Sequence, residues 1–277
     1  MPFTVSHVAA VLPAQRLLRR LGLFSAAAIG SMTPDFGILM PIHMSRAATH
    51  GLAALLSFCL PAGLATWWLF QLLIRPAWCA VLPGNWRRRL RAEHSGARLL
   101  DWRIWVGAAI AILAGALTHL VWDGFTHEGG RGVSMLPWLD EPFGPDLVGH
   151  PLRLYRWLQH GSSVIGLIVV TVAAWRWTRG RIDPSLPATI AAAARHAAAP
   201  PDLPARERHQ WQAAYLVLPL LLLLAAIAAG RLHVRPWTPV GDVVTQVVVL
   251  GLIAVGASQL LVSAAVRWRV RQRSLDG

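Results

Sequence analysis

Three residues that could bind a metal recur at four-residue intervals in one stretch of the chain: His119, Asp123 and His127. Residues at positions i, i+4 and i+8 of an α-helix lie on one face, so the two imidazoles and the carboxylate would form a polar stripe. Nitrogen and oxygen ligands of this kind suit zinc and other divalent ions. This stretch alone leaves open a second interpretation, in which a hydrogen-bonded histidine lies beside a capping carboxylate.

The polar stripe lies at the C-terminal end of an apolar run, Ile104–Trp122, that is long enough to cross a bilayer. Ionisable side chains at membrane depth are costly, and they therefore mark functional positions. His50 precedes one apolar run and His160 begins another, so these helix ends can meet at one membrane face. The full candidate set of ligands is His7, Asp35, His50, His119, Asp123, His127 and His160. The set predicts a site for a divalent metal, with zinc as the first candidate; a structural polar network is the alternative.

The composition places the chain among membrane proteins. Of its 277 residues 55% are hydrophobic and only 14% are charged, and the mean hydropathy is +0.47. The apolar runs mostly lack the polar face that helices of a soluble bundle would show. We therefore expect an all-α, polytopic membrane bundle with an N-terminal helical segment. The five expected transmembrane helices are Leu52–Ile74, Ile104–Trp122, Leu158–Trp177, Ala213–Ala229 and Val243–Val266.

The formal net charge is +13, and all 26 basic residues are arginines. These arginines flank the apolar runs and no nucleic-acid-binding motif accompanies them, so we expect them to contact membrane lipid and not nucleic acid. Their asymmetry predicts that the first and third connections and the C-terminal tail lie in the cytoplasm. The N-terminus and the candidate site then lie on the extracytoplasmic side. The two cysteines, Cys59 and Cys79, form neither a disulfide framework nor a metal-binding pair.

Three regions follow along the chain. Residues 1–177 form the expected metal-site membrane domain. Residues 178–210, rich in Arg, Ala and Pro, are expected to be a flexible cytoplasmic connection. Residues 211–277 contain two C-terminal transmembrane helices and a basic tail.

Several motifs in the first 170 residues resemble domain-of-unknown-function family 4184. They are the opening MPFTVSHVAAVLP, IGSMTPDF at 29–36, THG at 49–51, LTHLVWDGFTH at 117–127 and LQHGSS at 158–163. Members of this family are bacterial membrane proteins without an assigned reaction. The resemblance therefore implies a location in the bacterial cytoplasmic (inner) membrane, but it implies no activity.

A looser resemblance links the chain to inner-membrane metal-dependent hydrolases and to the zinc-dependent bacterial phospholipases C. The order His, Asp, His, His-x3-Asp, His is similar, but Gly51 stands where the first family usually has serine. Val164 stands where the second family's late His-x3-Glu pair would place its glutamate. The resemblance implies metal-dependent hydrolysis of a phosphoester, either a phospholipid or a lipid-linked substrate, with Asp35 orienting or deprotonating the attacking water.

Arg46 and Arg131 are then candidates to hold an anionic group of the substrate. Two other classes of function stay open at this point. Buried His and Asp residues also form ion pathways, so the protein could transport a metal or protons. It could instead be a non-catalytic membrane scaffold.

Overall fold

The computed structural model describes residues 4–39, 44–92, 99–146, 151–179, 203–232 and 240–275. Almost all of its elements are helices, which confirms the all-α class. In the described ranges the only sheet is a pair of short antiparallel strands, β1 (Pro142–Asp146) and β2 (Pro151–Arg153). Most of the expected flexible connection, at 178–210, lies outside the described residues.

Five described helical stretches are long and apolar enough to cross a membrane, as expected of a multi-pass membrane protein. They are Leu55–Val81, Trp102–Thr126, Leu154–Arg179, Ala205–Ala228 and Val243–Arg273. Each overlaps one predicted span, and most extend beyond it. The helices continue through flanking Arg-containing turns that hydropathy does not count, because arginine is a good helix former.

The described helices form two compact units. The first comprises Met1–Trp67 and Leu99–Gly180, and the second comprises Trp68–Arg98 and Arg181–Gly277. The described residues 68–92 contact the C-terminal helices of the second unit. All seven predicted site residues belong to the first unit.

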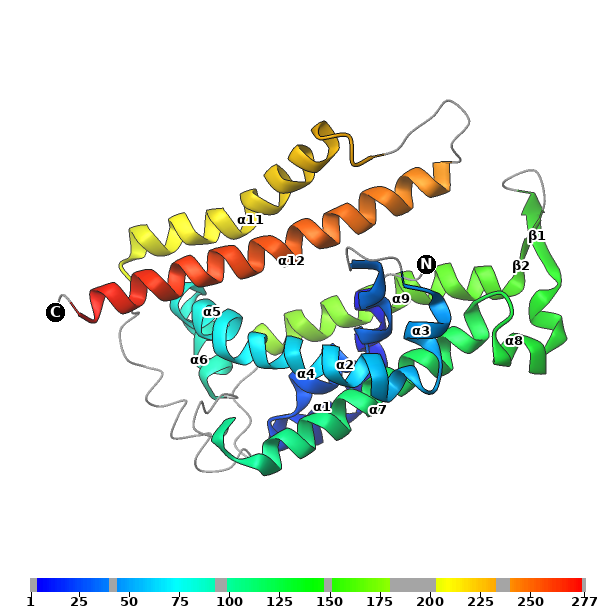
Figure 1. The fold of residues 1–277 in the computed structure, drawn as a ribbon, viewed down its shortest axis with the longest axis horizontal. Helices are drawn as coiled ribbons and strands as arrows, with labels where there is room; N and C mark the ends of the chain where they lie inside the picture. Colours follow the sequence, from blue (N-terminus) through cyan, green and yellow to red (C-terminus); the bar gives the residue numbers. More distant parts are fainter. Residues whose placement is uncertain are drawn as a thin grey trace. The chain divides into compact units, whose positions relative to one another are not determined.

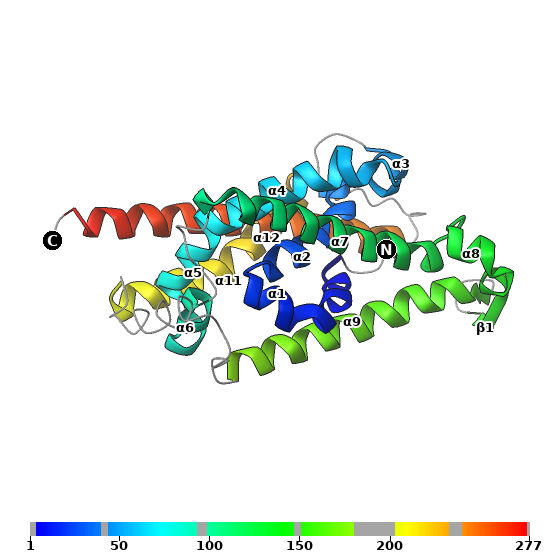
Figure 2. The same cartoon turned by 90° about the horizontal axis from the view of Figure 1, so that it is seen from below.

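The first unit is built on two long helices, α7 (Trp102–Thr126) and α9 (Leu154–Arg179). Figure 2 shows the N-terminal segment lying between them, where η1 contacts both helices and α2 packs on α7. The shorter elements are η1 (Thr4–Ala14), α1 (Gln15–Leu21), α2 (Phe24–Gly30), η2 (Thr33–Leu39), α3 (Arg46–His50), η3 (Leu55–Cys59), α4 (Leu60–Leu69), α8 (Arg131–Met135) and η6 (Pro137–Asp140).

Local chemistry explains where several of these helices begin and end. The Asp101 side chain caps α7 by accepting a hydrogen bond from the Arg103 backbone N–H at 3.0 Å. Gly22 ends α1 with a positive φ of 75°, a conformation that glycine adopts without strain. The chain can therefore turn sharply from α1 into α2, which brings α2 onto α7.

Helices α2 and α7 approach each other more closely than side chains would allow. A Cβ atom at Gly115 would lie 2.3 Å from the Ala27 carbonyl oxygen and 2.7 Å from the Ser31 backbone nitrogen. Glycine at this position lets the end of α2 rest directly on α7, one helical turn before His119. The contact fixes the backbone of Ser31 against the candidate site.

The second unit contains η4 (Phe70–Ile74), α5 (Arg75–Val81), α6 (Gly84–Ala92), α11 (Ala205–Ala228) and α12 (Val240–Arg273). Helices α11 and α12 lie side by side (Figure 1). The core of the unit includes Ala77 and Val81 of α5 packed with Val262 and Val266 of α12.

Candidate metal centre

Four elements of the first unit, with the residue that follows the last of them, bring six of the seven predicted residues together. His7 comes from η1, Asp35 from η2 and His50 from the last position of α3. His119 and Asp123 lie one turn apart on α7, and His127 follows directly after that helix. Side chains far apart in the sequence therefore converge on the carboxylate of Asp123.

The imidazole nitrogens surround this carboxylate at similar distances. Asp123 Oδ2 lies 3.5 Å from His119 Nε2 and 3.6 Å from His50 Nε2, while Asp123 Oδ1 lies 3.7 Å from His7 Nε2. The second carboxylate, of Asp35, places its Oδ1 atom 3.4 Å from His50 Nε2 and 3.7 Å from His119 Nε2. Two tetrahedral ligands of one zinc ion lie roughly 3.4 Å apart, so this spacing suits atoms that share a metal.

Several of the converging atoms are buried without a hydrogen-bond partner. These atoms are His7 Nε2, His50 Nε2, His119 Nε2 and Asp123 Oδ1. His119 is 0% exposed and Asp123 is 4% exposed. An unsatisfied buried polar atom costs about 1–3 kcal/mol, so a cluster of them calls for a ligand that satisfies all of them. A divalent cation bound by three imidazoles and one or two carboxylates fits this donor set.

Hydrogen bonds behind the cluster orient its members. His119 Nδ1 donates to the Ser31 carbonyl oxygen at 2.8 Å, which leaves the Nε2 lone pair facing the two carboxylates. The ring of His7 stacks on that of His119, with centroids 3.7 Å apart. The hydroxyl of Thr4 donates to Asp35 Oδ2 at 2.8 Å. These contacts preorganise the donor atoms before any ion binds.

The protonation states of the cluster also suit metal binding. Burial, reinforced by the neighbouring His119, lowers the pKa of His7 to about 4. Burial also lowers the pKa of His127 to about 4, against the opposing charge of Asp123. Burial alone would raise the pKa of Asp35, but the neighbouring imidazoles of His50 and His119 and the hydroxyl of Thr4 lower it below its usual value. At neutral pH these rings are neutral and the Asp35 carboxylate is ionised, as metal binding requires.

His127 is held at the edge of the cluster by a residue that sequence reasoning missed. Its Nδ1 atom lies 3.5 Å from Asp123 Oδ2, and its Nε2 atom accepts a hydrogen bond from the Gln159 side-chain amide at 3.0 Å. His160, the predicted ligand next in sequence, is exposed and has no hydrogen bond or ion pair with the cluster in the described chain. The spacing of Tyr155, Gln159 and Ser163, all buried on α9, is the signal that could have identified Gln159.

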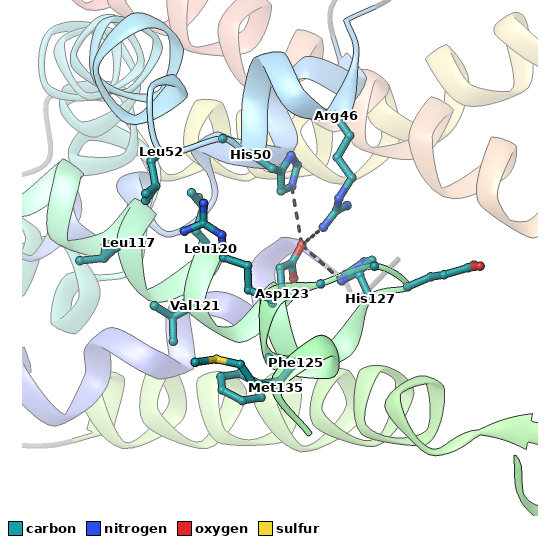
Figure 3. Close-up of a pocket in the computed structure, with 17 residues that line it drawn as sticks. Arg46, His50, Leu52, Leu117, Leu120, Val121, Asp123, Phe125, His127 and Met135 are labelled. Atoms are coloured by element: carbon teal, nitrogen blue, oxygen red, sulfur yellow. Dashed lines mark hydrogen bonds and ion pairs between the residues drawn. The ribbon is translucent and has the colours of Figure 1, made fainter. Parts of the chain in front are cut away.

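The cluster borders a pocket of about 540 Å³. His50, Asp123 and His127 belong to both the cluster and the pocket wall, whereas Asp35 does not line the pocket. The guanidinium of half-exposed Arg46 donates to Asp123 Oδ2 at 2.9 Å. Figure 3 shows the Asp123 carboxylate directed toward Arg46, His50 and His127. The candidate metal position is therefore reachable from the pocket.

No curated protein and no solved structure matches the chain. A family described as a domain of unknown function, DUF4184, matches residues 1–266. The match extends well past the first 170 residues that contain the recognisable motifs. Since it covers nearly the whole sequence and includes every residue of the cluster, the chain belongs to the DUF4184 family.

Proposed function

We propose that the protein is a membrane-embedded, metal-dependent hydrolase that acts on a phosphoester. The observation that carries this proposal is the continuity between the buried donor cluster and an open pocket. Structural zinc sites are closed by protein ligands, whereas catalytic sites keep a position for water or substrate. His50 and Asp123 face both the donor cluster and the pocket, and this arrangement supports a catalytic site.

The residues divide into those that hold the metal and those that face the substrate. A bound divalent ion would supply an activated water and polarise a phosphoryl oxygen. His7, His50, His119 and Asp123 are proposed as ligands. We assign Asp35 as a ligand, and not as the base that the phospholipase resemblance implies, because its carboxylate does not line the pocket. 

Two arginines of the pocket wall are proposed to contact the substrate. Arg46 and Arg131 both line the pocket and offer guanidinium groups to a phosphoryl group. Guanidinium groups near a reacting phosphoryl group stabilise the negative charge that develops on its oxygens. The pocket therefore suits an anionic phosphoester better than a neutral ester.

We place this site on the extracytoplasmic side of the bacterial cytoplasmic membrane. The cluster lies at the C-terminal end of α7, and Arg103 lies at the opposite end. The connection that precedes α7 is rich in arginine, including Arg87, Arg88, Arg89 and Arg91. Because arginine-rich connections stay in the cytoplasm, the opposite end of α7 faces outward.

The experiment that tests the proposal measures hydrolysis by metal-loaded, purified protein on a panel of phosphomonoesters and phosphodiesters. We expect wild type to hydrolyse at least one of them, and His119→Ala to lose metal and activity together. His160→Ala is the matched control, because this histidine is exposed outside the cluster. Metal uptake into proteoliposomes without any hydrolysis would contradict the proposal and support a transporter.

A further inference from the structure

The pocket beside the cluster has an apolar side that runs along α7. Leu117 and Val121 both line it and are 45% and 54% exposed. They lie one turn apart on one face of the helix, and Leu117 precedes Asp123 by six residues, about 9 Å along the helix axis. Leu52, which is 56% exposed, adds to the same apolar wall from the segment that follows α3.

The other side of the pocket is charged. Arg46 and Arg131 line it together with Glu128, whose side chain is 81% exposed and lies 4.0 Å from Arg156. Arg46 reaches Asp123 with one guanidinium nitrogen and has further N–H groups to donate. Two guanidinium groups on one side of a pocket are complementary to a phosphate group.

The location of the apolar wall identifies the kind of molecule that fits both sides. Helix α7 is one of the five candidate membrane spans, and the exposed side chains of Leu117 and Val121 on it suit the hydrocarbon of a bilayer. A hydrocarbon chain is the natural neighbour of such side chains, and the headgroup level of the bilayer adjoins the end of the helix. An amphiphile could therefore reach the site sideways without leaving the membrane.

We propose that this pocket binds a membrane lipid with an anionic phosphate headgroup, which arrives laterally from the bilayer. Its phosphate contacts Arg46 and Arg131, and one hydrocarbon chain lies along Leu52, Leu117 and Val121. This assignment rests on the proposed function, because it names the substrate class of the same site. The apolar wall orients the lipid and contributes little to its affinity, because a hydrocarbon chain gains little free energy when it moves from the bilayer to leucine and valine side chains.

Lipid retention by the detergent-purified, full-length protein tests whether a lipid binds along the apolar wall of Leu52, Leu117 and Val121, which we call the groove. Dioleoyl phosphatidic acid is the probe, and dioleoyl phosphatidylcholine is the comparison. Native mass spectrometry counts the bound lipid. We expect wild type to retain phosphatidic acid preferentially. Val121→Trp and Leu117→Trp should each weaken retention by about tenfold or more, because the indole overfills the groove. The matched control is Ile165→Trp on α9, a 63% exposed position outside the pocket, which should bind as wild type does.

The headgroup contact has its own pair of variants. Arg131→Gln should remove most of the preference for phosphatidic acid, whereas Arg103→Gln, at the other end of α7, should keep it. Equal retention by Val121→Trp, Leu117→Trp and Ile165→Trp would overturn the groove assignment. Because retention requires no turnover, groove-dependent binding without hydrolysis of any phosphoester would overturn the proposed function alone. Hydrolysis of soluble 4-nitrophenyl phosphate without groove-dependent retention would overturn this inference alone.

Discussion

The imidazole of His119 lies close to both carboxylates of the cluster, those of Asp35 and Asp123. Its spacing from Asp123 is evident in the sequence. A separation of four residues within a helix fixes both side chains on one face, so this pair follows from local geometry. His7, Asp35 and His50 come from separate elements, and their convergence depended on placing several helix ends at one membrane face. Sequence reasoning named them but gave no distances, because the folding of η1, η2 and α3 around α7 is a tertiary property.

Residue spacing alone could not decide which side chain of α9 contacts His127. LQH at 158–160 offers both Gln159 and His160, and the more familiar metal ligand is the histidine. The rotation of α9 about its axis decides which of the two faces α7, and packing of η1 against α9 contributes to that rotation: a Cβ at Gly166 would lie 2.8 Å from the Ser6 Cβ. The rotation thus presents Gln159 to His127.

The first prediction separates two roles for Asp35. If this carboxylate is a ligand, Asp35→Asn should lose most of the bound metal, because the amide oxygen is a weaker, uncharged donor. Elemental analysis of the purified variant measures this loss. Asp140→Asn, at an exposed aspartate paired with Arg153, is the control and should keep its metal. An Asp35→Asn protein that keeps its metal and loses only its rate would show that Asp35 is a base.

The second prediction concerns Gln159. Gln159→Leu removes the amide that holds the His127 ring beside the proposed ligand Asp123, and outer partners of metal ligands usually contribute about 10–100-fold to metal affinity. We therefore expect weaker metal binding in Gln159→Leu, measured by competition with a chelator, and no change in His160→Ala. Identical affinities for both variants would show that the hydrogen bond between Gln159 and His127 does not support the site.

The third prediction is that acid destabilises the metal-stripped protein between pH 6.5 and about 4. His7 and His127 each have a pKa lowered from 6.5 to about 4 in the folded protein, so the unfolded chain binds more protons in this window. The free energy of unfolding therefore falls as the pH falls. The lowered pKa of Asp35 acts in the same direction below its usual value of 3.8.

Thermal unfolding in detergent across this pH range measures the effect. The midpoint temperature should drop from pH 6.5 to pH 4, and His7→Gln should flatten the curve because it removes one titrating ring. A wild-type midpoint that stays constant or rises on acidification would contradict the burial of these two histidines as neutral groups.

At the scale of elements, the contact between α2 and α7 sets the geometry of the site. The fourth prediction is that Gly115→Ala displaces Ser31 from His119 Nδ1, because the new Cβ would meet the Ala27 carbonyl and the Ser31 nitrogen. Overpacking of this kind costs about 1–3 kcal/mol, and metal content should fall with stability. Thermal unfolding and elemental analysis measure the two effects.

Gly161→Ala on α9 is the matched control for this prediction. In the described part of the chain, no atom beyond its own helical turn lies within 4 Å of the position that its Cβ would take, and alanine favours a helix more than glycine does. This variant should be as stable as wild type or slightly more stable. If Gly115→Ala behaved in the same way, the close approach of α2 and α7 would not determine the site.

The membrane spans illustrate how far elements follow from the sequence. Uniformly apolar runs predicted all five, since only helices satisfy their backbone groups in lipid at that length. The N-terminal helical segment that the sequence predicts forms two elements, η1 followed by α1. The tighter winding of η1 accompanies its packing against α9 and α7, which local propensity does not encode.

At the scale of the whole molecule, the chain forms two compact units that do not follow the order of the sequence. The described residues 68–92 pack with α11 and α12, although they follow directly on the elements that build the site. Hydropathy could not predict this pairing, because a uniformly apolar helix gives no sign of which neighbour it will contact. The described site residues all come from the first unit, so metal binding is expected to be a property of that unit.

The most direct test of this account is the metal content of the purified protein. Plasma mass spectrometry of tag-free wild type, His119→Ala and His160→Ala measures it after exposure to zinc and removal of loosely bound ions. We predict at least one tightly held divalent ion per chain in wild type and in His160→Ala, and little in His119→Ala, because His119 belongs to both groups of buried donors, with His7 and Asp123 and with Asp35 and His50. Equal metal content in all three proteins, whether near zero or near one, would contradict the assignment of the cluster as a metal centre.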